Sequence, residues 1–330
     1  MRFVSTMVLG MPLLYTAAAL AGESPIPVVS EGKFGFSDHS GKVVIPYQFE
    51  DTGSFREGLA RVKQGGKWGF VDETGTLVVP AEFLAAADFY EGLSHVCKRE
   101  GLVGQASGFI DKTGKVVIGY EYTNAGNFSA GLARVEHDGK WGYVDKTGKL
   151  AIEPQFDEAS DFSDGLARVK SGGDWDGKYG YIDTQGQFKI NPRFKECGHF
   201  NEGLAPVSVD GKWGYINKSG EETIELQFAA AETFSNGMAC VKFGHKFGYA
   251  EKSGRVAINP VYDEAQRFSE ELAAVKINGK WGYVDVSGKT VIEPQFDEAG
   301  AFGDGIARVS VGQKTGWIDT SGKYIWPLSK

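Results

Sequence analysis

Five tryptophans are the side chains of this sequence best suited to recognising a ligand. Four of them recur at one place in a repeated pattern and the fifth stands in a glycine-rich insertion: Trp68, Trp141, Trp213 and Trp281, and then Trp175. An aromatic face attracts cations and the CH groups of sugars. The four regular rings would line pockets between repeats, and Trp175 would be an exposed binding anchor. Core packing of the four rings is the favoured interpretation, and a Trp175 folded back on its own hairpin is at least as well supported as an exposed anchor.

The residue types that carry catalysis or bind metals show no reactive arrangement. The five histidines occupy unrelated repeat positions and lack the spacing of a zinc motif: His39, His95, His137, His199 and His245. Paired acids such as Asp157-Glu158 recur in register, and so do Asp-x-Thr/Ser-Gly segments. This regularity indicates turns and solvated faces instead of a glycosidase pair. We therefore expect no catalytic residue, no metal site and no cofactor.

The chain has 330 residues and repeats a unit of about 34 residues nine times. One glycine marks each unit: Gly35, Gly69, Gly108, Gly142, Gly180, Gly214, Gly248, Gly282 and Gly316. An aromatic residue follows fourteen positions after each of the first eight glycines, and a phenylalanine follows six positions later. Insertions near residues 99–107 and 172–176 interrupt the period. A fixed period of this length is the signature of a repeat architecture.

Each unit predicts three short antiparallel strands joined by polar turns. In one copy, residues 59–63 alternate apolar and charged side chains, residues 67–71 carry the Trp-Gly pair, and residues 76–79 precede Pro80. Pairs such as Asp138-Gly139 suit a tight hairpin. Three strands alone are marginal in water, so each unit needs its neighbours to cover its apolar face. The glycine of the Trp-Gly pair would let a neighbouring ring or backbone approach closely.

These features predict an all-β tandem array over residues 33–330, made of nine antiparallel three-stranded units. We expect an open, solenoid-like stack, with partial units as caps at both ends. The open form is favoured because nine is an unusual number of propeller blades. In addition, about 34 residues are short for a four-stranded blade, which takes about 40–45. A closed β-propeller is the alternative.

Residues 1–21 predict a cleaved signal peptide, because Arg2 precedes an apolar stretch that ends in Ala19-Leu20-Ala21. Residues 22–32 would then be an N-terminal lead-in. We expect an exported chain, periplasmic or secreted, with no stable membrane span after cleavage; an uncleaved anchor is the alternative.

Cysteine content and charge limit the remaining possibilities. Cys97, Cys197 and Cys240 allow at most one internal disulfide, and their scattered positions favour buried thiols. The 35 basic and 43 acidic residues give a net charge of -8. An acidic chain without a basic stripe argues against nucleic-acid binding.

The recurring string Gly-Lys-Trp-Gly-Tyr/Phe-Val-Asp, as in Gly139–Asp145 and Gly279–Asp285, resembles the WG (KWG) repeat family of bacterial proteins. The resemblance covers residues of about 30–325. It implies an all-β repeat fold, and that family has no single agreed activity or set of catalytic residues. Asp210–Gly220 is similar, more faintly, to the aromatic hairpins of cell-wall-binding (choline-binding) repeats, although their period is about 20 residues.

The functional hypothesis is a non-enzymatic binding or scaffold protein that works outside the cytoplasm. A long repeated surface without a singular reactive cluster motivates it. The partner would be a protein or a glycan of the cell envelope. The alternatives are a hydrolase-like enzyme with its site on the loops of a closed propeller, and a structural spacer.

Overall fold

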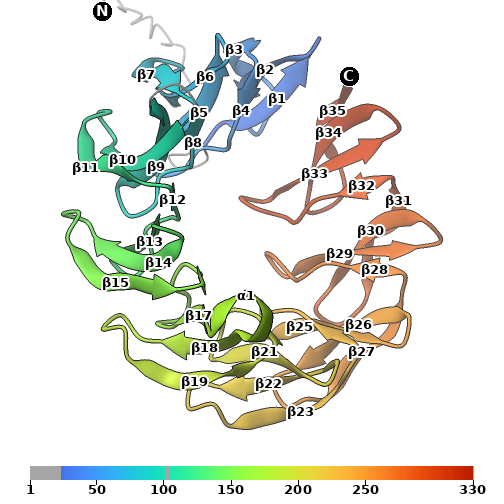
Figure 1. Ribbon diagram of the computed structural model, residues 1–330. Coiled ribbons are helices and arrows are strands. Elements are labelled where there is room, and N and C mark those ends of the chain that lie inside the picture. The colour runs from blue at the N-terminus through green and yellow to red at the C-terminus, as the bar shows by residue number, and fades with distance from the viewer. Residues whose placement is uncertain (1–23, 101–103, 330) are drawn as a thin grey trace, which may run out of the picture.

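Alternating buried and exposed residues build the same antiparallel sheet again and again along the chain. The computed structural model describes residues 24–100 and 104–329, and these form nine sheets arranged in a ring (Figure 1). We call the sheets blades 1 to 9 in chain order. Blade 1 has three strands and every later blade has four.

Every blade uses the same strand types, which we name by their place in it. The short strands, which open blades 2 to 9, are β4 (Asp51–Thr52), β8 (Ala85–Ala86), β12 (Asn124–Ala125), β16 (Glu158–Ala159), β20 (Glu196–Cys197), β24 (Ala230–Ala231), β28 (Glu264–Ala265) and β32 (Glu298–Ala299). The hairpin strands are β1 (Ile26–Ser30), β5 (Leu59–Gln64), β9 (Leu93–Glu100), β13 (Leu132–His137), β17 (Ala167–Ser171), β21 (Leu204–Val209), β25 (Met238–Phe243), β29 (Leu272–Ile277) and β33 (Ile306–Val311).

The other two strand types complete each blade toward the outside. The WG strands are β2 (Lys33–Ser37), β6 (Lys67–Asp72), β10 (Gly104–Asp111), β14 (Lys140–Asp145), β18 (Lys178–Ile182), β22 (Lys212–Asn217), β26 (Lys246–Glu251), β30 (Lys280–Asp285) and β34 (Lys314–Asp319). The rim strands are β3 (Val43–Phe49), β7 (Leu77–Phe83), β11 (Val116–Tyr122), β15 (Leu150–Phe156), β19 (Phe188–Phe194), β23 (Glu222–Phe228), β27 (Val256–Tyr262), β31 (Thr290–Phe296) and β35 (Tyr324–Ser329). Strands such as β11, β15, β19 and β23 lie along the outside of the ring (Figure 1).

The glycine of the Trp-Gly pair lies at a bulge between the WG strand and the rim strand. In blade 4 the pairing passes from Trp141 opposite Phe156 to Tyr143 opposite Ile152, so the rim strand holds two extra residues. A Cβ atom on Gly142 would lie 2.5 Å from the carbonyl oxygen of Ile152. The predicted close approach is therefore confirmed, and the group that approaches is backbone.

One phenylalanine from each later blade packs on the blade before it. Its ring meets the Phe or Tyr that directly follows the marker glycine in the WG strand of the preceding blade, with ring centroids 4.7–5.0 Å apart. The pairs are Phe36–Phe55, Phe70–Phe89, Phe109–Phe128, Tyr143–Phe162, Tyr181–Phe200, Tyr215–Phe234, Tyr249–Phe268 and Tyr283–Phe302. Such a pair contributes about 0.5–1.5 kcal/mol beyond the burial of its area. The recurring phenylalanine is thus the main apolar contact between blades.

The ninth interface joins the two ends of the chain. The indole Nε1 of Trp317 in β34 donates a hydrogen bond to the carbonyl oxygen of Pro27 in β1, at 2.9 Å. Ile26 and Ile306 share a buried cluster, and the rings of Tyr47 and Trp326 lie 6.4 Å apart. Blade 1 therefore packs against blade 9, and the ring is closed (Figure 1).

The prediction of an open, solenoid-like stack is therefore wrong, and the alternative, a closed β-propeller, is correct. The expected end caps do not exist as such, because the two ends cover each other. The estimate that about 34 residues are too few for a four-stranded blade failed for a simple reason. The fourth strand has only two residues, as in β8 (Ala85–Ala86), and so adds little length.

The described parts of the expected lead-in and of the two insertions form regular secondary structure in the ring. Residues 26–30, from the expected lead-in, form β1 of blade 1. The first insertion extends the hairpin of β9 and β10, and the second forms a single helical turn, α1 (Gly173–Asp176). The expected signal peptide, residues 1–21, lies outside the described residues. Within the described part of the chain, no helix is long and apolar enough to cross a membrane.

Gly142→Ala should lower the free energy of unfolding by about 1–3 kcal/mol, because the added methyl group meets a backbone carbonyl that cannot move without breaking the blade. Urea unfolding followed by circular dichroism measures the change. Gly303→Ala is the matched control, because no atom lies within 4 Å of its added Cβ and its φ is not positive. Equal stability of the two variants would contradict the proposed role of this glycine.

Candidate functional site

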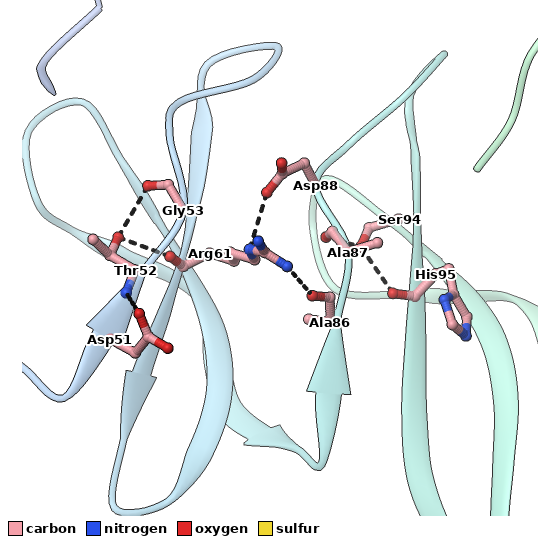
Figure 2. Close-up of polar contacts among 9 residues, drawn as sticks. All are labelled: Asp51, Thr52, Gly53, Arg61, Ala86, Ala87, Asp88, Ser94 and His95. Atoms are coloured by element: carbon pink, nitrogen blue, oxygen red, sulfur yellow. Dashed lines mark hydrogen bonds and ion pairs between the residues drawn. The ribbon is translucent and has the colours of Figure 1, made fainter. Parts of the chain in front are cut away.

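Arginines on the hairpin strands connect neighbouring blades. The guanidinium of Arg61 in β5 reaches blade 3, where its Nη1 donates to the carbonyl oxygen of Ala86 at 2.9 Å. Its Nε lies 3.2 Å from Oδ1 of Asp88, with which it forms an ion pair (Figure 2). The same guanidinium lies over the ring of Trp68, 5.4 Å from its centre. A carbonyl, a carboxylate and an indole therefore fix this one cation.

The arrangement recurs in blades 4 and 5 with one important change. Arg134 donates to the carbonyl oxygen of Ala159 at 2.7 Å and pairs with Asp161 at 3.0 Å. Arg168 donates to the carbonyl oxygen of Cys197, also at 2.7 Å. However, the position that holds aspartate in the other two bridges is His199 here. Within the described residues Arg168 forms no ion pair.

The side chains of the bridges in blades 4 and 5 line a cavity of about 550 Å³, whose lining comes from blades 4 to 8. Arg134 and Arg168 contribute two of its cations, and Arg267, which precedes the phenylalanine of blade 8, contributes a third. Asp161 is the one carboxylate among the lining residues. We call this cavity the arginine pocket. Its neutral polar lining comes from Ser160, Ser163, His199, Asn201 and Thr233.

The arginine pocket carries positive charge in a protein whose net charge is -8. Three guanidinium groups face one carboxylate, which leaves an excess of two positive charges. Desolvation and then the charge of Arg168 lower the pKa of His199, so its imidazole is neutral near pH 7. The exposed carboxylate of Glu232 belongs to the residue next to Thr233, but it is not part of the lining.

Blade 3 places a histidine where the bridging arginine stands in other blades. His95 in β9 is half-buried, and burial together with the charge of Arg134 lowers its pKa to about 4. Its Nε2 lies 3.5 Å from Sγ of Cys97, which in turn lies 3.4 Å from Oγ of Ser107. All three cysteines are free thiols.

The paired acids make structural contacts, one with the preceding blade and one within their own blade. Asp157 forms an ion pair with Lys140 of the preceding blade and accepts a hydrogen bond from the backbone of Gly173. Glu158 accepts a hydrogen bond from the hydroxyl of Tyr179 at 2.6 Å. These carboxylates are therefore engaged in structure.

The Asx turns are also confirmed. Oδ1 of Asp145 accepts hydrogen bonds from the backbone of Thr147 and Lys149 and from the hydroxyl of Thr147. Among the described residues, no group of three or more His, Cys, Asp or Glu could hold a metal ion.

The four regular tryptophans that the sequence suggested as binding residues lie at the interfaces between blades. Trp281 is buried, with 8% of its surface exposed, and Trp68, Trp141 and Trp213 are half-buried against core clusters. Their packing is thus shown, and a role in ligand binding stays a prediction. Trp175 falls within α1, and its side chain lies outside the described part of the structure.

The sequence reasoning missed the arginines that line the pocket. Arg134 and Arg168 occupy the third position of a Leu-Ala-Arg-Val string that was read only as an alternating strand. The available signal was a departure from the repeat. For Arg61 and Arg134, the residue before the recurring phenylalanine of the next blade is an aspartate, Asp88 or Asp161. For Arg168, the residue at that position is His199.

Burial of neutral His95 makes the stability of the fold depend on pH. Its pKa is lower in the folded chain than in the unfolded one, so the unfolded chain binds the proton first as pH falls. The contribution of His95 to the free energy of unfolding should therefore be constant above pH 6.5. Between about pH 6.5 and 4 the free energy of unfolding should fall by up to about 3 kcal/mol. His95→Gln should flatten this part of the stability–pH curve, measured by urea unfolding from pH 7 to 4.5.

The matched control for that experiment is His245→Gln, which changes an exposed turn and should keep the wild-type pH dependence. If the His95→Gln and His245→Gln curves had the same slope, the depressed pKa of His95 would be refuted.

Comparison with solved structures supports the propeller assignment. The crystal structure of a eukaryotic initiation factor is similar, with 10% identity, a TM-score of 0.67, and 94% of this chain and 98% of that chain covered. The dihydro-heme d1 dehydrogenase NirN in complex with DHE matches with 14% identity and a TM-score of 0.49, covering 94% of this chain and 75% of its own. Hsv2 of Kluyveromyces lactis, with loop 6CD replaced by a Gly-Ser linker, matches with 10% identity and a TM-score of 0.43, covering 73% and 94%. At these identities the first likeness shows the fold alone.

Sequence comparison identifies the repeats themselves. No curated protein sequence matches the chain. The family model for the WG containing repeat matches eight successive segments: residues 34–68, 68–100, 108–141, 141–175, 179–213, 213–246, 247–281 and 281–314. These segments account for most of the chain, and their period is that of the blades. The chain therefore belongs to the WG containing repeat family.

Proposed function

We propose that this protein is a non-enzymatic binding protein that works outside the cytoplasm and recognises a protein partner or a glycan of the cell envelope. One observation supports the proposal above others. The tyrosine hydroxyls that recur in the repeat hold neighbouring blades together. In contrast, the residue before the recurring phenylalanine changes from blade to blade, and four such residues, Asp161, His199, Thr233 and Arg267, gather in the arginine pocket.

The size and position of the arginine pocket fit binding. Cavities of about 300–1,000 Å³ with a few convergent polar groups are typical ligand sites. The pocket has about 550 Å³ and draws its lining from five consecutive blades, so the site exists only when these blades are packed together. Most of its lining residues, such as His199 and Arg267, lie in the segments that lead from a short strand to a hairpin strand.

Acids clustered at one end of a closed ring would favour the hydrolase-like alternative. The ring is closed, but three of the four charged groups that line the arginine pocket are guanidinium groups. A guanidinium stays protonated in proteins and does not serve as a general acid or base. The binding role is therefore the better supported of the two.

The extracytoplasmic location rests on the leader pattern of residues 1–21, in which a basic residue, an apolar stretch and Ala19-Leu20-Ala21 follow one another. Binding and location are testable together. A photo-crosslinking amino acid placed at Thr233, in the arginine pocket, should form a discrete adduct in living cells. The adduct should be recovered from the extracytoplasmic fraction.

The matched control carries the same crosslinker at Val261 on the rim strand β27, which is 55% exposed on the outside of the ring. This position should give no adduct of the same mass. Adducts only at Val261, or at neither position, would contradict a ligand in the pocket, and recovery from the cytoplasm would contradict the location. Conversion of the captured ligand to a smaller product would favour the hydrolase-like alternative.

A further inference from the structure

The arginine bridges provide an internal comparison that distinguishes structure from recognition. In blades 2 and 4 the bridging arginine is neutralised by an aspartate of the next blade, as Arg61 is by Asp88 (Figure 2). In blade 5 the same carbonyl contact is kept, but His199 replaces the aspartate. Because the carbonyl bridge persists without the carboxylate, joining blades does not require the charge to be neutralised.

Contacts within the protein hold the guanidinium of Arg168 in place and leave some of its N–H donors available to a ligand. Its guanidinium lies 4.8 Å from the centre of the Tyr179 ring, and one of its nitrogen atoms donates to the carbonyl oxygen of Cys197. A guanidinium has five N–H groups in a planar fork. The remaining donors have no hydrogen-bond partner among the described residues. A cation held in this way loses little entropy when it binds an anion.

Arg267 brings a second unneutralised charge to the same cavity. It is exposed and forms no hydrogen bond or ion pair with any described residue. The neighbouring residue Gln266 instead takes over the bridge to the next blade, because its Nε2 donates to the carbonyl oxygen of Ala299 at 2.9 Å. Arg267 is therefore not needed for joining blades 8 and 9.

We propose that the arginine pocket binds an oxyanion group, a carboxylate or a phosphate, of its ligand, with Arg168 as the bidentate contact and Arg267 as the second cation. A planar guanidinium matches the two oxygens of either group through parallel N–H···O bonds. The side chains of Asn201 and Thr233 in the same lining add neutral polar groups. This inference rests on the proposed binding function and assigns the chemical class of its ligand.

The first test is direct binding by the full chain, measured by isothermal titration in Tris buffer with sodium glucuronate, inorganic phosphate and uncharged glucose. At least one anion should bind saturably at one site per chain and more weakly as NaCl is raised, and glucose should not bind. Stronger binding of glucuronate would identify an acidic sugar as the source of the group, and stronger binding of phosphate a phosphoryl group.

Three single variants separate recognition from folding. Arg168→Gln should weaken anion binding at least about tenfold, and Arg267→Gln about three- to tenfold, because each removes a charge-assisted contact. Arg267→Gln should leave the melting temperature unchanged, since this side chain has no described partner. Arg193→Gln is the matched control, because Arg193 also bonds a carbonyl of the next blade and lies over Phe194, but on the rim strand β19. It should bind anions like the wild type.

The assignment is overturned if neither anion binds at about 20 mM, or if Arg168→Gln and Arg267→Gln both bind like the wild type. These failures differ from failure of the proposed function. If the Thr233 crosslink still forms in the Arg168→Gln, Arg267→Gln double variant, the proposed binding function is supported and the proposed oxyanion site is contradicted. If an anion binds in solution but no crosslink forms in cells, the oxyanion site is supported and the proposed protein or glycan partner is contradicted.

Discussion

Every level of this structure depends on one constraint: a blade cannot cover its own apolar faces. The phenylalanine that follows the short strand of each later blade packs on an aromatic ring of the blade before it, as Phe162 does on Tyr143. Eight such pairs join nine blades, so the chain supplies no aromatic pair of this kind for the last interface. The indole of Trp317 and the backbone of Pro27 replace it. Stability is thus distributed over neighbour contacts and requires the ends to meet.

The same constraint explains how polar groups are satisfied between blades. In blades 4 to 8 the tyrosine of the WG strand donates its hydroxyl to a carbonyl of the next blade, as Tyr181 does to Gly198 at 2.7 Å. Blade 2 has Phe70 at this position and no hydroxyl to offer. There the corresponding carbonyl of Ala87 accepts from Oγ of Ser94, at 2.7 Å (Figure 2). Buried carbonyls require a partner, and in this case the serine hydroxyl supplies it. The arginine bridges also satisfy carbonyl groups of the next blade. Arg168, whose bridge lacks the aspartate, lines the arginine pocket.

The repeat, its strands and its turns were predictable because they are local. The Asx turn at Asp145 and the close approach at Gly142 follow from a few adjacent residues and are found as expected. Closure was not predictable in this way. The short strands have two residues and therefore no alternation to detect, and the contact between Trp317 and Pro27 spans 290 residues. The arginine pocket was missed because its lining comes from five blades. The one signal in the sequence was that two of the Leu-Ala-Arg-Val arginines have an aspartate before the phenylalanine of the next blade, whereas Arg168 has His199 there.

The most direct test of the account is a set of distances between spin labels at equivalent lysines, in a background with the three native cysteines replaced by alanine. Lys33, Lys67, Lys212 and Lys314 each begin the WG strand of their blade, in blades 1, 2, 6 and 9. A closed ring predicts that the distance from 33 to 314 resembles the distance from 33 to 67, and that the distance from 33 to 212 is the longest. If the distance from 33 to 314 were the longest of the three, the ring would be open and the account would be wrong.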